Sequence, residues 1–557
     1  MLKDMHTERR AGVVLAAITI ACLLPFVGRA FNIDEPLFLW AARHIQSHPL
    51  DFYGFSVNWL DCLRPMRLMM LNPPLVAYYM AAAARIVGWG EVGLHIAFLV
   101  PAIAAVLGTY VLARRFCSRP IIAALATLLT PVFLMSSATV MCDTMMLAFW
   151  VWATVLWIRG IDEDRHLPLL ASAVLIGLCA LTKYYGAVLI PLFLAYALAR
   201  KRRPGLWALH MLIPLAAFVG YELATREMYG FGLLSGAVLG SVKFQENVNL
   251  ADRLVTALAF TGGCLPTALF AAPLLWPRRS IVAAAILTCA AGVVIASTTS
   301  VGALQLWRES GLRWDVLVQL AVMAAAGAGV LALAAVDLLE RKDADSALLA
   351  AWVVGTLVFA GFLNWTTNGR SILPMVPAVA VLIVRRVESF RKGAGKGVRW
   401  SLAWPLVPAA ALAFFVTAAD YTLAGSVRDT ARKMVALHAS REHTLWFQGH
   451  WGFQYYMQEA GAKPIDFDDT TLEPGDVVVV PVNNTRNFGL DPNYASVVRT
   501  LDVPVCPWLT TMRSARGAGF YSSIWGPMPF VFGPVPKEEY QIWRVGSTMR
   551  YRSCVLH

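Results

Sequence analysis

The chain has 557 residues, of which 58% are hydrophobic and 15% charged, and its net charge is +12. Soluble globular proteins are about 45–50% apolar and about 25% charged. This composition excludes an ordinary cytosolic enzyme, a disordered chain and a nucleic-acid-binding domain, and it predicts a polytopic membrane protein.

Apolar runs separated by charged residues or by Gly and Pro predict about thirteen transmembrane helices. The expected spans are 11–29, 91–113, 120–138, 143–158, 167–182, 184–199, 206–224, 254–276, 281–298, 315–337, 346–363, 371–387 and 400–419. A shorter amphipathic stretch, Pro73 to Arg85, is typical of a helix that lies at the membrane interface.

The distribution of basic residues predicts which side of the membrane each loop occupies. With the N-terminus in the cytoplasm, the loops that alternate to the inside contain Arg114 and Arg115, Arg200 to Arg203, and Arg385 to Arg399. The excess positive charge then lies on the cytoplasmic side, as the positive-inside rule requires. We therefore expect a bacterial inner-membrane protein with a periplasmic C-terminus and no nucleic-acid partner.

Two regions follow from this arrangement. Residues 1–420 form the membrane region, with a long first outer loop at 30–90, and residues 421–557 form a small periplasmic α/β domain. The second region contains the strand-like HTLWFQG, the helix-like GFQYYMQEAG, the buried strand DVVVVPV and the closing strand EYQIWRV. Its two cysteines, Cys506 and Cys554, lie in an oxidising compartment, so they form a disulfide or remain two unrelated thiols.

Acidic residues at membrane depth are expensive, so each is a functional candidate. Asp34 and Glu35 lie at the outer end of the first span, and Asp143 lies at the outer turn that enters the fourth span. Helix capping is the alternative explanation for all three. Carboxylates at one level of the membrane also form the kind of pocket that a general base or a cation site needs.

Basic residues lie at the same predicted level as these acids. Lys183 interrupts an apolar run and Arg370 precedes a span, so both side chains could hold a lipid phosphate. Extension of the lysine to the interface is the alternative. Weaker candidates for a substrate-binding loop are Arg64, Arg67, Asn72, Tyr229 and Lys243.

Five short motifs occur in order along the membrane region: Asp34-Glu35, Asn72-Pro73-Pro74-Leu75, Asp143, Leu181-Thr182-Lys183, and Arg370 followed by Leu373-Pro374. In this pattern the chain resembles the GT-C glycosyltransferases that use polyprenyl-phosphate sugars, the group that contains protein O-mannosyltransferases and the lipid A aminoarabinose transferase. Such proteins often carry a basic residue before the Pro pair. Because this chain has Asn72 there, we expect no cationic contact from that position.

The resemblance implies an inverting glycosyltransferase with its active site on the outer face. Asp34 would be the general base, Glu35 would orient Asp34 or the acceptor, and Asp143 would position the acceptor. Lys183 and Arg370 would stabilise the departing phosphate.

The resemblance also implies the partners: a polyprenyl-phosphate-linked sugar, a lipid, glycan or protein acceptor, and membrane lipid. No cofactor is required, although Asp34 and Asp143 could hold Mg²⁺ or Mn²⁺. The chain has no P-loop and no GxGxxG after a strand, which argues against a nucleotide-driven enzyme. The alternatives are a lipid or anion transporter, in which charges would mark a path through the membrane, and a structural membrane protein.

Overall fold

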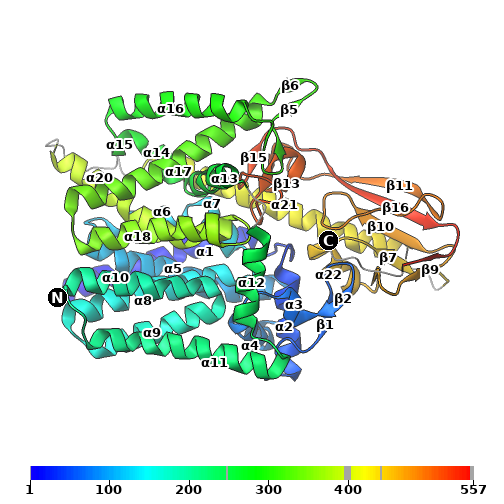
Figure 1. Ribbon diagram of the computed structural model, residues 1–557, viewed down its shortest axis with the longest axis horizontal. Helices are drawn as coiled ribbons and strands as arrows, with labels where there is room; N and C mark the ends of the chain where they lie inside the picture. The colour runs from blue at the N-terminus through cyan, green and yellow to red at the C-terminus, as the bar shows by residue number, and fades with distance from the viewer. Residues whose placement is uncertain (1, 246–248, 394–402, 439–441, 552–557) are drawn as a thin grey trace.

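The computed structural model describes residues 2–245, 249–393, 403–438 and 442–551. A bundle of helices forms one end of the molecule, and a domain built around a β-sheet forms the other (Figure 1). The N-terminus lies at the far end of the bundle from this sheet domain. The chain passes from the helical part to the sheet domain through one long helix, α21 (Leu406–His438).

The helical part contains twenty-one α-helices among the described residues. They are α1 (Leu2–Leu23), α2 (Glu35–Ser47), α3 (Met66–Met69), α4 (Leu75–Val87), α5 (Glu91–Phe116), α6 (Pro120–Leu128), α7 (Pro131–Ser137), α8 (Cys142–Glu163), α9 (His166–Thr182), α10 (Leu189–Lys201), α11 (Leu212–Tyr229), α12 (Leu233–Gln245), α13 (Leu250–Cys264), α14 (Pro266–Phe270), α15 (Ala272–Leu275), α16 (Arg278–Ala296), α17 (Trp314–Arg341), α18 (Ala344–Val358), α19 (Gly369–Ile372), α20 (Val376–Gly393) and α21. Short helical turns extend several of them: η1 (Leu24–Phe26), η2 (Tyr184–Val188), η3 (Leu206–Met211), η4 (Phe359–Leu363) and η5 (Leu373–Met375).

Fewer helices than predicted are suited to cross a membrane. Within the described ranges, eight helices are long and apolar enough, or nine if one bent pair counts as a span. The eight are Glu8–Phe26, Glu91–Phe116, Cys142–Glu163, Leu206–Tyr229, Arg278–Ala296, Trp314–Arg341, Ala344–Leu363 and Leu406–His438. The protein is therefore a polytopic helical membrane protein, but the expected count of thirteen is too high.

The difference arises where apolar runs break or stop early. The run at 120–138 forms two helices, α6 and α7, that meet at 64° with Pro131 at the start of the second. Helix α9 has 17 residues and α10 has 13, because the chain leaves the helix at Lys183. Hydropathy registers these segments as spans, whereas proline and local backbone geometry shorten the helices.

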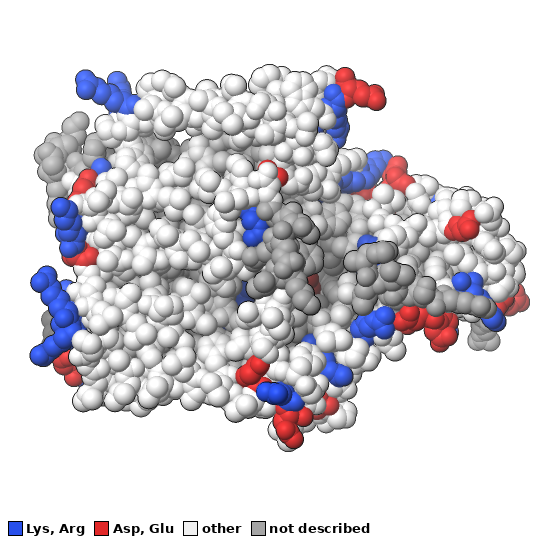
Figure 2. All heavy atoms as spheres, in the orientation of Figure 1, with Lys and Arg blue, Asp and Glu red and all other residues white. Residues whose placement is uncertain are grey.

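A broad band of the helical part carries almost no charge on the face shown in Figure 2. Lys and Arg side chains, with Asp and Glu among them, lie at the end where the N-terminus lies, and further charges border the sheet domain. This pattern is what a bilayer requires, because charged side chains are costly in the hydrocarbon core.

The C-terminal domain contains a mixed five-stranded sheet in the order β11-β16-β10-β7-β8. Strand β10 pairs in parallel with β7 and antiparallel with β16, with Val479 opposite both Phe447 and Ile542. Its elements are β7 (Leu445–Phe447), α22 (Trp451–Glu459), β8 (Lys463–Pro464), β9 (Thr471–Leu472), β10 (Val477–Pro481), β11 (Ala495–Val503), β12 (Leu509–Thr510), β13 (Met512–Arg513), η6 (Ser514–Arg516), β14 (Ala518–Gly519), β15 (Val531–Phe532), β16 (Glu538–Val545) and β17 (Met549–Arg550).

The predicted strands at HTLWFQG, DVVVVPV and EYQIWRV correspond to β7, β10 and β16, and the predicted helix corresponds to α22. Strand β11 was not predicted. It is an exposed edge strand with a bulge between Val497 and Arg499, so it lacks the alternation of buried and exposed residues that marks a half-buried strand.

The remaining strands lie in loops of the helical part. They are β1 (Ser56–Asn58) and β2 (Leu63–Pro65) in the first outer loop, and β3 (Ser300–Val301), β4 (Leu304–Gln305), β5 (Trp307–Arg308) and β6 (Gly311–Leu312) between α16 and α17. The β1–β2 hairpin packs against the sheet domain: the backbone N–H of Phe467 donates to the carbonyl of Asp61 at 2.7 Å, and Arg486 pairs with the Asp61 carboxylate at 2.6 Å.

Of the two alternatives for Cys506 and Cys554, the disulfide between them does not form, because Cys506 is a free thiol. Cys554 lies outside the described residues. Cys62, in the first outer loop, is disulfide-bonded instead. The prediction treated the C-terminal region as separate from that loop, whereas the fold packs the two together.

Candidate functional site

Four charged side chains meet where the helical bundle adjoins the sheet domain, and they come from four separate elements. Asp34 precedes α2, Asp143 lies in the first turn of α8, Lys183 follows the last residue of α9, and Arg370 lies in α19. They form two ion pairs, each between an acid and a base that are far apart in sequence.

The first pair joins Asp34 and Arg370. The Nη2 atom of Arg370 donates to Oδ2 of Asp34 at 2.8 Å, with the arginine side chain 12% exposed and the aspartate 35%. Although Asp34 occupies the N-cap position of α2, its side chain makes no capping hydrogen bond. Its carboxylate therefore does more than begin a helix, and it remains open to solvent on one side.

The second pair joins Asp143 and Lys183 at 2.7 Å. The Asp143 side chain is 1% exposed and the lysine side chain 18%. The N-cap residue of α8 is Met141, so Asp143 is not the cap that the alternative explanation requires. Lys183 turns toward this acid, which argues against simple extension to the membrane interface.

The two pairs are neighbours. The Nη1 atom of Arg370 contacts Sδ of Met141 at 2.9 Å, two residues before Asp143, and Arg370 acts electrostatically on Asp143 as well as on Asp34. Burial opposes the charged form of Arg370, but these two carboxylates outweigh it and raise the pKa of the guanidinium above its ordinary value.

Two buried polar atoms in the site have no hydrogen-bond partner in the described part of the chain. They are Oδ2 of Asp143 and Nε of Arg370. Buried polar groups are ordinarily paired, and an unpaired one costs about 1–3 kcal/mol. The carboxylate oxygen can accept a hydrogen bond and the guanidinium nitrogen can donate one, so the two atoms suit a ligand that has both a hydroxyl group and a negatively charged oxygen.

Glu35, which was expected to orient Asp34 or an acceptor, is fully buried and has several protein partners. One carboxylate oxygen accepts from the backbone N–H of Val140 at 2.8 Å; the other accepts from the N–H of Asn32 at 2.7 Å and from Arg29 at 2.6 Å. These bonds hold the Asp143 turn against the start of α2, so Glu35 joins the two halves of the site.

Sequence reasoning missed a second buried network directly behind Glu35. Arg29 pairs with Asp420 of α21 at 2.9 Å, and the Tyr521 hydroxyl donates to the same carboxylate at 3.0 Å. All three side chains are buried. Arg29 and Asp420 could have been found by asking which other charges border apolar runs, whereas nothing in the local sequence marks Tyr521.

The weaker loop candidates contact other groups. Arg64 pairs with Asp468 of the sheet domain at 3.2 Å, and the Arg67 guanidinium lies 5.8 Å from the centre of the Tyr229 ring. Asn72 accepts a hydrogen bond from the Tyr53 hydroxyl through its backbone carbonyl at 2.7 Å. The side chain of Lys243 lies outside the described residues. No described contact joins this group to the four charged residues.

Asp34 and Asp143, the two acids that were expected to hold any divalent cation, each have one carboxylate oxygen in an ion pair, with Arg370 and Lys183 respectively. In the described residues, one group of metal-ligating side chains lies within mutual reach: Cys62, Asp466 and Asp468. Because Cys62 is disulfide-bonded, its sulfur is not a thiolate ligand.

Comparison with protein families finds a match within the membrane region. Residues 72–223 match the model of the dolichyl-phosphate-mannose-protein mannosyltransferase family. This segment includes the Asn72 motif, Asp143 and Lys183, and the match confirms the resemblance to GT-C glycosyltransferases that the motifs suggested. No protein of curated function matches the chain in sequence.

Several solved structures are similar to the chain at low sequence identity. ArnT from Cupriavidus metallidurans bound to undecaprenyl phosphate is 16% identical, with a TM-score of 0.43, over 84% of this chain and 93% of that one. The S. cerevisiae Pmt1–Pmt2 protein O-mannosyltransferase complex bound to the sugar donor is 14% identical, with a TM-score of 0.31, over 41% and 34%. The mycobacterial arabinofuranosyltransferase AftD is 12% identical, with a TM-score of 0.39, over 98% and 42%.

Proposed function

We propose that this membrane protein is an inverting glycosyltransferase that moves a sugar from a polyprenyl-phosphate donor to an acceptor hydroxyl. The observation that carries this proposal is the pair of adjacent ion pairs, Asp34–Arg370 and Asp143–Lys183. Each pair contains a buried atom that has no partner within the described part of the chain. The family match over residues 72–223 supports the same class of reaction.

In the proposed reaction, Asp34 is the general base. Its ion pair with Arg370 engages Oδ2, which leaves Oδ1 to accept the proton of the acceptor hydroxyl. The acceptor oxygen forms a bond to the anomeric carbon as the bond from that carbon to the phosphate oxygen breaks, and the electron pair leaves with the phosphate. Attack opposite the leaving group inverts the configuration of the sugar.

The cations act on the leaving group. A polyprenyl-phosphate sugar carries one negative charge, and the departing phosphate gains a second. Arg370 offers its Nε, which has no partner among the described residues, and Lys183 offers a point charge, so both can stabilise the charge that develops in the transition state. Asp143 holds Lys183 in place and, through its open oxygen, positions the acceptor.

We place this reaction on the outer face of a bacterial inner membrane. The site lies at the end of the bundle next to the sheet domain, away from the end where the N-terminus lies and basic residues gather (Figures 1 and 2). The positive-inside rule puts that basic end in the cytoplasm. An acceptor on a lipid, a glycan or a protein would approach from the side of the sheet domain.

The test is transfer by the purified protein in liposomes, measured with labelled polyprenyl-phosphate sugars and a panel of acceptors. Asp34→Asn should lower the rate by at least about a hundredfold, because it removes the general base, and undecaprenyl phosphate should still bind. Asp429→Asn, at an acid whose side chain is 68% exposed, is the matched control and should behave as wild type. Transfer that is unaffected by Asp34→Asn would refute the assignment; lipid translocation without transfer would favour a transporter.

A further inference from the structure

The segment that carries Arg370 is held by a loop of the C-terminal domain. The backbone N–H of Gly369 donates to the carbonyl of Phe520 at 2.8 Å, and the N–H of Ser523 donates to the carbonyl of Thr367 at the same distance. The Ser523 hydroxyl accepts from the N–H of Thr367 at 3.1 Å. The site residue and its supporting loop are therefore separated by about a quarter of the chain but joined by backbone hydrogen bonds.

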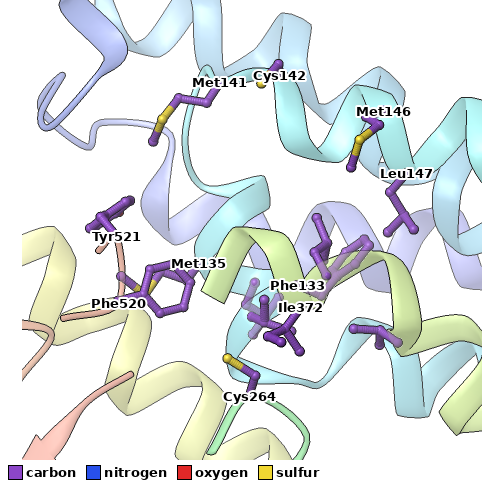
Figure 3. Close-up of a cluster of buried hydrophobic side chains, with 14 of the residues drawn as sticks. Phe133, Met135, Met141, Cys142, Met146, Leu147, Cys264, Ile372, Phe520 and Tyr521 are labelled. Carbon is purple, nitrogen blue, oxygen red and sulfur yellow. The ribbon is translucent and has the colours of Figure 1, made fainter. Parts of the chain in front are cut away.

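The approach of the two segments is close enough to require a glycine. A Cβ atom at Gly369 would lie 2.5 Å from the ring of Phe520, well inside van der Waals contact. Phe520 and Tyr521 belong to the same buried cluster as Met135 and Met141 (Figure 3). The loop is thus packed into the core of the bundle rather than resting on its surface.

Tyr521 connects the Arg29 network to the site. Its hydroxyl donates to Asp420 at 3.0 Å and accepts from Arg29 at 3.2 Å, and both partners are buried. Its ring lies under the Arg370 guanidinium, 5.4 Å from the ring centre to the central carbon. The hydroxyl bonds fix the ring, and the ring face attracts the cation.

We propose that Tyr521 is a positioning residue of the active site: it holds the Arg370 guanidinium in an orientation from which it can contact both Asp34 and the donor phosphate. This inference rests on the proposed function. It means that the C-terminal domain completes the donor site, although the four charged groups all come from the helical part. The competing explanation is that Tyr521 is only a core residue that stabilises the fold.

Two substitutions separate these explanations. Tyr521→Leu removes the ring, whereas Tyr521→Phe keeps it and removes the hydroxyl. We expect Tyr521→Leu to raise the KM for the donor and the Kd for undecaprenyl phosphate by about tenfold. Tyr521→Phe should stay within about threefold of wild type, because it keeps the ring under the guanidinium.

The matched control is Tyr540→Leu, at a tyrosine of the same domain that is equally buried and packs against Phe453. It should lower thermal stability but leave the donor KM unchanged. If Tyr521→Leu does not fold, Ser523→Ala provides the test at a partly exposed position of the same loop, because it removes the hydroxyl bonds to Thr366 and Thr367; we expect the donor KM to rise about threefold.

The positioning role is overturned if the folded Tyr521→Leu protein, or Ser523→Ala in its place, binds undecaprenyl phosphate and donor as wild type does. It is also overturned if Tyr540→Leu raises the donor KM to the same extent. Failure of the proposed function would give a different result, because the wild-type protein would then transfer no sugar from any donor. In that case the Kd for undecaprenyl phosphate, compared between wild type and Tyr521→Leu, would still show whether Tyr521 supports the site.

Discussion

The pairing of Lys183 with Asp143 allows a test that separates a cation bound to substrate from one that only neutralises an acid. Lys183→Ala removes the partner of a carboxylate whose side chain is 1% exposed. Breaking a buried ion pair costs about 3–5 kcal/mol. Because the lysine side chain is 18% exposed and water can reach it, we expect the loss of stability at the low end of that range.

Lys183→Ala should also lower the rate of sugar transfer, separately from its effect on stability. A hydrogen bond to a charged group contributes about 1.5–3 kcal/mol, so loss of the Lys183 contact to phosphate should lower kcat/KM by about tenfold to a hundredfold. The double variant Lys183→Met with Asp143→Asn removes both charges. It should recover most of the stability, because no unpaired charge stays buried, but it should not recover activity.

Two assays on the same preparations test this reasoning: thermal unfolding in detergent, and steady-state transfer with a defined polyprenyl-phosphate sugar. Asp143→Asn alone shows how much of the activity depends on the acid. Full activity in the double variant would mean that Lys183 only balances Asp143. Wild-type kinetics for Lys183→Ala would refute the phosphate contact directly.

Three further outcomes are expected. Arg370→Lys keeps the charge but loses the planar fork, so it should weaken donor binding about tenfold in a titration with undecaprenyl phosphate; wild-type affinity would show that charge alone suffices. Glu35→Gln removes one of the buried negative charges that pair with Arg29, so the free energy of unfolding should fall by about 3 kcal/mol, seen as a lower thermal unfolding temperature; an unchanged unfolding temperature would mean that the network does not support the fold. A reporter fused to the C-terminus should be active only in its extracytoplasmic form, and activity of a cytoplasmic reporter would invert the proposed location of the site.

The local sequence identified the charged residues of the site because a charge next to an apolar run is conspicuous wherever it occurs. Asp34, Asp143, Lys183 and Arg370 each interrupt or border such a run, and the structure brings all four together. Composition indicated a membrane protein for the same reason, since burial in lipid imposes a strong bias on whole segments. The strands β7, β10 and β16 were predictable because their apolar residues are continuous or alternate.

Only the tertiary structure decided which charges are partners, because each ion pair joins residues far apart in the chain. It also gave Glu35 a different position from Asp34, although they are neighbours in sequence: one carboxylate is buried among backbone donors, and the other faces solvent and an arginine. The number of spans depended on bends that hydropathy does not register, such as the one between α6 and α7. The role of Tyr521 could not be predicted for a related reason. Its contacts with Asp420 and Arg370 form because a loop of the C-terminal domain packs against the helical bundle, and no local sequence pattern predicts that packing.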